Sequence, residues 1–227
     1  MEHILFQISI WVLPAVLAIT LHEAAHGWVA HKLGDPTAYL MGRVTFNPLK
    51  HVDPFGTLML PAGLLLLSGG SMAFGWAKPV PVNVRDLPNP RRAMALIAAA
   101  GPVSNLLMAL AAAILLHTLQ YMPEVLQMWL FYNLGNAVVV NLVLFCFNLI
   151  PLPPLDGGRI AVGLLPRPLA YRLARVERYG LPILLTLLFV VPWVADKLGT
   201  RFVPFDYLMA GPVSAVWRLI AWMTGLG

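Results

Sequence analysis

Two histidines and a glutamate lie within one short stretch, Leu-His-Glu-Ala-Ala-His-Gly over residues 21–27. On an α-helix, His22 and His26 are four residues apart and point the same way, so their two imidazoles can hold one metal ion. Glu23 lies about 100° further around the helix, where its carboxylate could hydrogen-bond a water at the metal without ligating the metal. A histidine pair with this spacing and an adjacent glutamate is typical of zinc metalloproteases.

A third ligand must come from elsewhere, because catalytic zinc usually has three protein ligands and a water. The chain lacks the His-x-x-Gly-x-x-His extension of the metzincins, since Gly27 and His31 fall at the wrong spacing. His31 is one candidate for the third ligand. Asp156 is another, since it follows directly after an apolar run that several prolines must end. Ionisable residues at membrane depth are candidates for functional sites.

The composition of the chain indicates a membrane protein. Hydrophobic residues make up 59% and charged residues 11% of the sequence, and the mean hydropathy is +0.76, which excludes an ordinary soluble enzyme. The formal charge of +5 does not indicate a nucleic-acid partner, because the basic residues bracket apolar runs, as in membrane topology. We expect the lipid bilayer as partner, and no nucleic acid. The single cysteine, Cys146, excludes a disulfide within the chain.

Apolar segments predict the transmembrane helices, each of which needs about 20 residues. They fall near residues 4–27, 93–119, 130–150, 180–195 with flanks, and 207–225. We expect an all-α polytopic membrane protein with five to six transmembrane helices, in a single integral-membrane domain over residues 1–227. The catalytic core would cover about residues 1–160, followed by C-terminal helices over about residues 180–225.

Basic residues predict the orientation in the membrane. The loop 120–129 has no Lys or Arg, whereas residues 151–179 contain five arginines, which places the first outside and the second in the cytoplasm. The basic loops on both sides of residues 55–73 also favour the cytoplasm. Segment 55–73, which contains helix-interrupting proline and glycines, is therefore expected to be re-entrant. The histidine pair would then lie toward the cytoplasmic side, in what we expect to be a prokaryotic plasma (inner) membrane.

Four further motifs follow the histidine pair along the chain. They are GRVTFNPLKHVDP over residues 42–54, FGWAKPV over 74–80, AGPVSN over 100–105 and NLIPLPPLDGG over 148–158. In this order, together with HEAAH, they resemble the signatures of the site-2 protease family of intramembrane zinc metalloproteases, peptidase family M50. The resemblance covers about residues 18–160. It is closest to the compact branch of the family that has only the membrane core, without PDZ or CBS domains.

The resemblance implies roles for five residues. His22, His26 and Asp156 would be the ligands of one Zn²⁺ per chain, and Glu23 would be the general base. Asn148 would bind and position the substrate.

Residues 39–46 are rich in strand-favouring types, with a turn pair, Asn47-Pro48, directly after them. We expect a small membrane-associated β hairpin here, whose exposed edge binds a substrate that has been drawn out as a strand, and the resemblance implies the same role. A structural loop that covers the site is the alternative. The expected substrate-binding residues of the hairpin are Gly42, Arg43, Val44, Thr45 and Phe46.

Together these features predict a protease that hydrolyses peptide bonds within or near transmembrane segments of protein substrates. Regulated intramembrane proteolysis and clearance of signal-peptide remnants are the expected roles. A membrane metal or proton transporter is the alternative, because intramembrane acids and histidines also mark ion pathways, although the chain shows no repeated halves. A catalytically inert adaptor is a third hypothesis, although such a protein would be free to lose Glu23 or Asp156.

Overall fold

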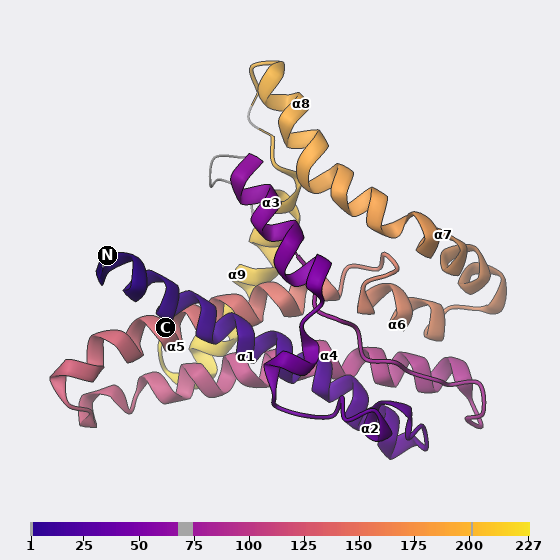
Figure 1. Ribbon diagram of the computed structural model, residues 1–227, viewed down its shortest axis with the longest axis horizontal. Helices are drawn as coiled ribbons and strands as arrows, with labels where there is room; N and C mark the ends of the chain where they lie inside the picture. The colour runs from indigo at the N-terminus through magenta and orange to yellow at the C-terminus, as the bar shows by residue number, and fades with distance from the viewer. Residues whose placement is uncertain (1, 68–74, 201) are drawn as a thin grey trace.

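Long helices dominate the computed structural model, which describes residues 2–67, 75–200 and 202–227. Helices α1 (Glu2–Leu33), α4 (Pro90–Leu116) and α5 (Glu124–Asn148) lie side by side and form the central bundle (Figure 1). A helix satisfies all of its own interior backbone hydrogen bonds, as an apolar segment in lipid requires. The helices predicted at residues 4–27, 93–119 and 130–150 correspond to α1, α4 and α5, and are confirmed.

Small side chains and interhelical hydrogen bonds hold the bundle together, as is usual where lipid supplies no hydrophobic force between helices. The Trp129 indole donates to Ser9 Oγ over 2.9 Å, and Asn136 Nδ2 donates to Ile10 O over 2.8 Å. These bonds join α5 to the first half of α1. The main buried apolar cluster consists of Ala109, Ala112, Ala113, Val138, Leu142 and Ile220.

The chain leaves the bundle after α6 (Asp156–Leu164), which packs against α4. Helix α7 (Arg167–Leu185), a π-helical turn (η4, Thr186–Val190) and α8 (Val191–Lys197) follow one another as a long arm that projects from the bundle (Figure 1). Four described helices are long and apolar enough to cross a membrane, judged by length and composition. They are His3–Leu33, Pro90–Leu116, Glu124–Asn148 and Arg167–Lys197.

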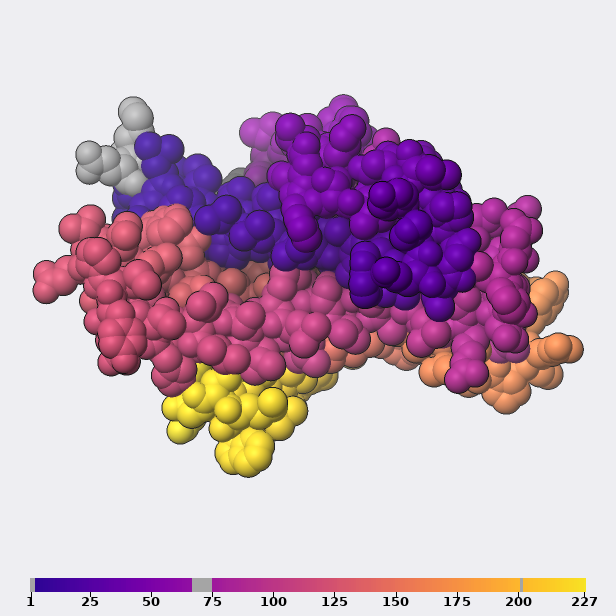
Figure 2. Space-filling model, turned by 90° about the horizontal axis from the view of Figure 1, so that it is seen from below, coloured from indigo at the N-terminus to yellow at the C-terminus, as the bar shows by residue number. Residues whose placement is uncertain are grey.

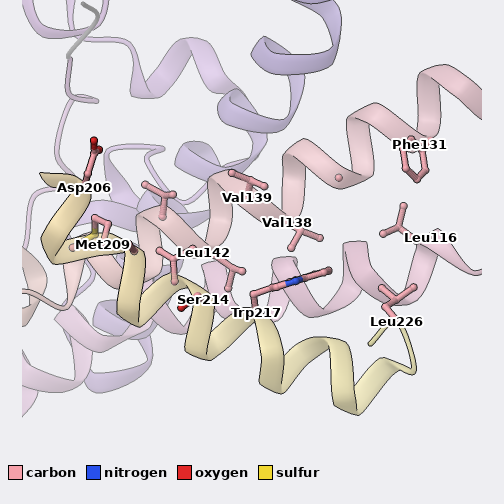
Figure 3. Close-up of a pocket in the computed structure, with 14 residues that line it drawn as sticks. Leu116, Phe131, Val138, Val139, Leu142, Asp206, Met209, Ser214, Trp217 and Leu226 are labelled. Carbon is pink, nitrogen blue, oxygen red and sulfur yellow. The ribbon is translucent and has the colours of Figure 1, made fainter. Parts of the chain in front are cut away.

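Helix α9 (Pro204–Thr224) lies across α5 and the end of α4, and it protrudes from the bundle in Figure 2. The expectation of a spanning helix at 207–225 is not supported, because Asp206, Arg218 and the Gly211–Pro212 pair lower the apolar character of this helix. The described residues thus contain four candidate spans instead of the expected five to six. Trp217 extends into a largely apolar groove of about 850 Å³ between α5 and α9 (Figure 3).

The predicted β hairpin is wrong, because the described residues contain no strand. Residues 37–43 instead form a helical turn, α2 (Thr37–Leu40), closed by hydrogen bonds from Met41 N to Thr37 O and from Arg43 N to Ala38 O. Gly42 then reverses the chain at φ +63°. Tertiary packing overrides strand propensity here, since Ala38 and Val44 lie against Gly27 of α1, where a Cβ would be 3.2 and 2.9 Å from them.

Segment 55–73 is described only in part, since residues 68–74 lie outside the described residues. A 3₁₀ turn (η1, Pro48–His51), a π-helical turn (η2, Pro54–Met59) and α3 (Leu60–Leu67) make up the described part. The apolar helical stretch that η2 and α3 form, Pro54–Leu66, is shorter than a membrane span. The flanking loops are hydrogen-bonded to each other, for example from Lys78 N to His51 O over 2.9 Å.

A 3₁₀ turn, η3 (Leu119–Tyr121), connects α4 to α5.

Asp35 also joins these two loops. Its buried carboxylate accepts hydrogen bonds from Thr37 N over 3.0 Å, from the Thr37 hydroxyl, and from Asn83 N over 2.6 Å. Burial alone would raise the pKa of Asp35, but these hydrogen bonds outweigh that effect and hold the pKa below its ordinary value. The loops before and after segment 55–73 are thus fixed at the same end of the bundle.

Gly180 offers a test of how the arm is attached. A Cβ at Gly180 would collide with the carbonyl oxygen of Pro153, so Gly180→Ala should destabilise the protein by about 1–3 kcal/mol through overpacking. The measurement is the thermal unfolding midpoint in detergent. Gly211→Ala is the control, since a Cβ there would meet nothing within 4 Å, and it should be neutral or stabilising by up to about 1 kcal/mol. Equal effects of the two substitutions would contradict this packing.

Candidate metal centre

The ring of His26 has a defined orientation. Its Nδ1 lies 2.7 Å from the carbonyl oxygen of Ile97 in α4. A carbonyl can only accept a hydrogen bond, so the hydrogen is on Nδ1. In the neutral ring, Nε2 therefore keeps its lone pair.

His22 also has its hydrogen on Nδ1, because a chain of two side-chain amides fixes the acceptor that faces this nitrogen. His22 Nδ1 lies 2.6 Å from Asn105 Oδ1, and Asn105 Nδ2 donates to Ala18 O over 3.3 Å and to Asn141 Oδ1 over 2.8 Å. Asn141 Nδ2 donates in turn to Ala137 O over 2.8 Å. Because backbone carbonyls fix both amides, Asn105 presents its oxygen to His22. That oxygen accepts the hydrogen of Nδ1, which leaves the lone pair on Nε2.

Both Nε2 atoms meet the carboxylate of Asp156. They lie 3.1 Å from each other, and Asp156 Oδ2 is 3.2 Å from His22 Nε2 and 3.4 Å from His26 Nε2. Three lone-pair donors thus face one point, and their ligand atoms all lie within 4.8 Å of one another. Two imidazole nitrogens and one carboxylate oxygen form a donor set that suits zinc. The residues fit a zinc ion that has three protein ligands.

The loop after α5 brings Asp156 to the histidines. Prolines end α5, and α6 begins at Asp156. The two residues that follow have no room for a side chain. A Cβ at Gly157 or Gly158 would collide with the backbone of Leu149 or of Pro153, respectively. The Asp-Gly-Gly sequence thus allows the first turn of α6 to pack closely on the loop and to hold the carboxylate in place.

Gly101 of α4 provides the space in front of the histidines. A Cβ at this position would lie 2.5 Å from His22 Cε1 and 2.5 Å from His26 Nε2. The absence of a side chain lets α4 approach the two rings closely. A side chain here would also crowd both Nε2 atoms, since a Cβ would lie 2.6 Å from His22 Nε2.

Glu23 lies beside this cluster and is not one of its three ligands. Its Oε2 accepts a hydrogen bond from Val80 N over 3.0 Å. Val80 belongs to the extended segment of residues 78–82, which we call the strap. One oxygen of the Glu23 carboxylate is therefore held by the backbone of the strap.

Two other predicted site residues are not joined to the three ligands. His31 stacks on Tyr39, with ring centroids 4.5 Å apart, so the structure brings Asp156, and not His31, to the histidine pair. Asn148 is half-buried at the end of α5, where its Nδ2 donates to Leu144 O of the preceding turn over 3.0 Å. The sequence alone left the choice of third ligand open, and the geometry favours Asp156.

Residues 42–46 lie in different surroundings. Gly42 is in an exposed turn, and the buried Arg43 binds the strap. Val44, Thr45 and Phe46 line an apolar groove of about 710 Å³ between α1 and α4. Leu21, Ala24, Ala25 and Trp28 form the α1 wall of this groove.

The strap and the Ile97 carbonyl are contributors to the site that the sequence did not indicate, whereas for Asn105 and Asn141 the sequence left a site role and helix packing equally open. Only the asparagines could have been recognised from their residue type, because an asparagine within an apolar helix needs a hydrogen-bond partner. The motif AGPVSN contains both Gly101 and Asn105. Their spacing of four residues places them on one face of α4, toward the histidines.

Comparison with known proteins identifies the family. The model of Peptidase family M50 matches residues 10–191. The chain belongs to this family. YwhC of Bacillus subtilis (strain 168), provisionally named a zinc metalloprotease, is 44% identical over 187 residues, which are 80% of each chain. Rip2 of Mycolicibacterium smegmatis, provisionally named in the same way, is 30% identical over 175 residues, 76% of this chain and 64% of the relative. No solved structure matches the chain.

The resemblance to the site-2 protease family is thereby confirmed. Family membership and the names of the relatives identify the chain as a zinc metalloprotease. The four apolar helices and the family together make it an integral membrane protein. The transporter alternative is not favoured.

The open volume at Gly101 gives a direct test of the metal centre. Gly101→Ala would place a methyl group 2.5 Å from His26 Nε2, so it should abolish zinc binding. The measurement is the zinc content of the purified protein. Gly135→Ala in α5, where a Cβ meets nothing within 4 Å, should retain zinc. Full zinc content in Gly101→Ala would contradict the position of the site.

Removal of the amide that holds His22 should weaken zinc binding without abolishing it. We expect Asn105→Leu to lower zinc affinity about 10- to 100-fold, as is usual when the hydrogen-bond partner of a zinc-bound histidine is lost. Asn105→Asp should lose less, because a carboxylate also accepts from His22 Nδ1. The measurement is zinc affinity by competition with a chelator. An unchanged affinity in Asn105→Leu would show that the amide is only a packing element.

Proposed function

We propose that this protein is an intramembrane zinc metalloprotease, which hydrolyses peptide bonds within or near transmembrane segments of membrane-protein substrates. One observation carries the proposal. Three ligand atoms converge beside a glutamate, and two of the ligands and the glutamate are on α1, a helix long and apolar enough to cross a membrane. A reaction centre on such a helix is suited to substrates that lie in the bilayer. Regulated proteolysis of membrane proteins and clearance of signal-peptide remnants are the proposed roles.

One Zn²⁺ per chain is proposed, held by His22, His26 and Asp156. The described residues contain one such group of side chains, and each histidine is oriented through its Nδ1. When bound, zinc supplies polarisation of the scissile carbonyl and activation of a water. We propose that residues 1–227 form a single integral-membrane domain, with its catalytic core in about residues 1–160.

Glu23 is the proposed general base. Val80 N–H binds Oε2, so the remaining carboxylate oxygen can take a proton from the attacking water. The same carboxyl group then delivers this proton to the departing amine. Such proton transfer by a positioned side chain typically contributes about 10²- to 10⁴-fold to the rate.

Substrate contacts are proposed at two places, the end of α5 and the groove along α1. Asn148 is a neutral donor and acceptor at the end of α5, suited to the backbone of an extended substrate. Val44, Thr45 and Phe46 line the groove along α1, where apolar side chains of a substrate can be accommodated. For Gly42 the proposed contribution is the turn that presents these three residues.

The proposed orientation places the metal centre toward the cytoplasmic side of a prokaryotic plasma membrane. Each of the loops 34–53 and 75–89 contains two basic residues, and five arginines lie in the segment 159–178, which favours the cytoplasmic side for all three. Hydrogen bonds between the first two loops, such as Asn83 N to Asp35 Oδ2, support a common side for both. This supports a re-entrant course for the segment between them.

Glu23→Gln tests the proposed function, because glutamine keeps the size of the side chain and an oxygen acceptor for Val80 N–H. Zinc content should stay unchanged, whereas cleavage of a model transmembrane substrate should fall about 10²- to 10⁴-fold. Glu177→Gln is the control at an exposed glutamate on α7, and it should cleave normally. Cleavage by Glu23→Gln at a rate close to that of the wild type would exclude Glu23 as the base.

A further inference from the structure

The strap contains an unusual distribution of hydrogen-bond donors. Its sequence is Lys-Pro-Val-Pro-Val over residues 78–82, and proline has no backbone N–H. Between Lys78 and Val82, the only backbone donor is therefore Val80 N. That single donor is bound to Glu23 Oε2 over 3.0 Å.

The two prolines also fix the shape of the strap. Each proline sets its own φ near −65°, and it drives the residue before it into an extended conformation. Lys78 and Val80 are those preceding residues. Val80 is buried against α1, where a Cβ on Gly27 would lie 3.2 Å from its Cγ1. The strap thus lies along α1 as a stiff extended segment.

Arg43 binds the strap at two of its carbonyl oxygens. Its side chain is buried, and its Nη2 donates to Lys78 O over 2.6 Å and, less closely, to Pro79 O over 3.4 Å. Within the described parts of the chain, Arg43 has no carboxylate at ion-pair distance, and its buried Nε has no partner. A buried guanidinium without a counter-ion is costly. The carbonyl contacts of the strap are thus its main compensation.

One peptide group connects Arg43 to Glu23. The Pro79 carbonyl and the Val80 N–H belong to the same planar unit, which is trans, because the cis peptide of the described chain is Pro153–Pro154. In a trans unit the C=O and the N–H point in opposite directions. When the guanidinium binds the oxygen, the hydrogen is directed toward the opposite side, where Glu23 lies. A cation at the oxygen also polarises the unit and strengthens the hydrogen bond on its N–H.

We propose that Arg43 is a positioning residue for Glu23, which acts through the Pro79–Val80 peptide group. It fixes the orientation of this group, and so the N–H that holds the carboxylate beside the metal ligands. The proposal rests on the proposed role of Glu23 as general base. It gives Arg43 a function in the reaction without contact with substrate.

The test compares Arg43→Met and Arg43→Lys with Arg85→Met, a control at an exposed arginine. The first readout is hydrogen–deuterium exchange in residues 78–82, where only Lys78, Val80 and Val82 carry amide hydrogens. Loss of the anchor should speed exchange of the Val80 amide about tenfold in Arg43→Met, the size expected for one weakened hydrogen bond. Arg43→Lys should show a smaller increase, because the ammonium can still reach one carbonyl. Arg85→Met should show none.

The second readout is kinetic and is made on the same samples. In Arg43→Met, kcat should fall about 10- to 100-fold, as expected when a catalytic group is misplaced, with KM and zinc content unchanged. Arg43→Lys should recover part of this loss. Unchanged exchange of Val80 would overturn the proposal, and so would faster exchange with normal kcat.

A third variant covers the case in which Arg43→Met does not fold. Pro79→Ala keeps Arg43 but relaxes the strap, and it should speed Val80 exchange and lower kcat in the same direction. Failure of either effect would overturn the proposal. Loss of the general-base role itself would be recognised separately, because Glu23→Gln would then remain active whatever the exchange of Val80.

Discussion

A backbone carbonyl can only accept a hydrogen bond, and this constraint decides which ring nitrogen of each histidine in the candidate metal centre is free to bind a metal. The Ile97 carbonyl takes the hydrogen of His26 directly. The Ala18 and Ala137 carbonyls do the same for His22 at a distance, through Asn105 and Asn141. In both rings the lone pair is thereby left on Nε2, facing Asp156. Acceptors on α1, α4 and α5 thus orient the two histidines of α1, while close packing at Gly157 and Gly158 holds Asp156 of α6 opposite them.

The bundle serves this arrangement in two ways. Small residues allow α4 to come so close to α1 that a histidine ring can reach a main-chain oxygen of its neighbour. The close-packed amides are also the polar contacts that hold helices together in lipid. The same side chains thus contribute to assembly of the fold and to orientation of the ligands, so the stability of the bundle and the geometry of the site depend on each other.

The central helices and the histidine pair could be predicted from the sequence, because both depend on local periodicity. The three central helices follow from long apolar runs, and the grouping of His22 with His26 follows from helical spacing. The prediction of a β hairpin at residues 39–46 was wrong, because packing of Ala38 and Val44 against Gly27 outweighed strand propensity. The contact between Asp156 and the histidine pair depends on packing between segments more than 120 residues apart, so no local pattern could establish it. The link from Arg43 to Glu23 depends in the same way on the path of a loop.

The proline spacing of the strap has a consequence for molecular recognition. A peptide that adds to the edge of an extended segment needs alternating donors and acceptors along that edge. The strap lacks N–H groups at two positions and has committed the one between them to Glu23. Arg43 already binds the carbonyl oxygens of Lys78 and Pro79, so an incoming backbone would find neither a free amide nor a full set of free carbonyl oxygens along this edge. The segment that holds Glu23 is therefore a poor template for strand addition, so a peptide would have to bind on another side of this carboxylate.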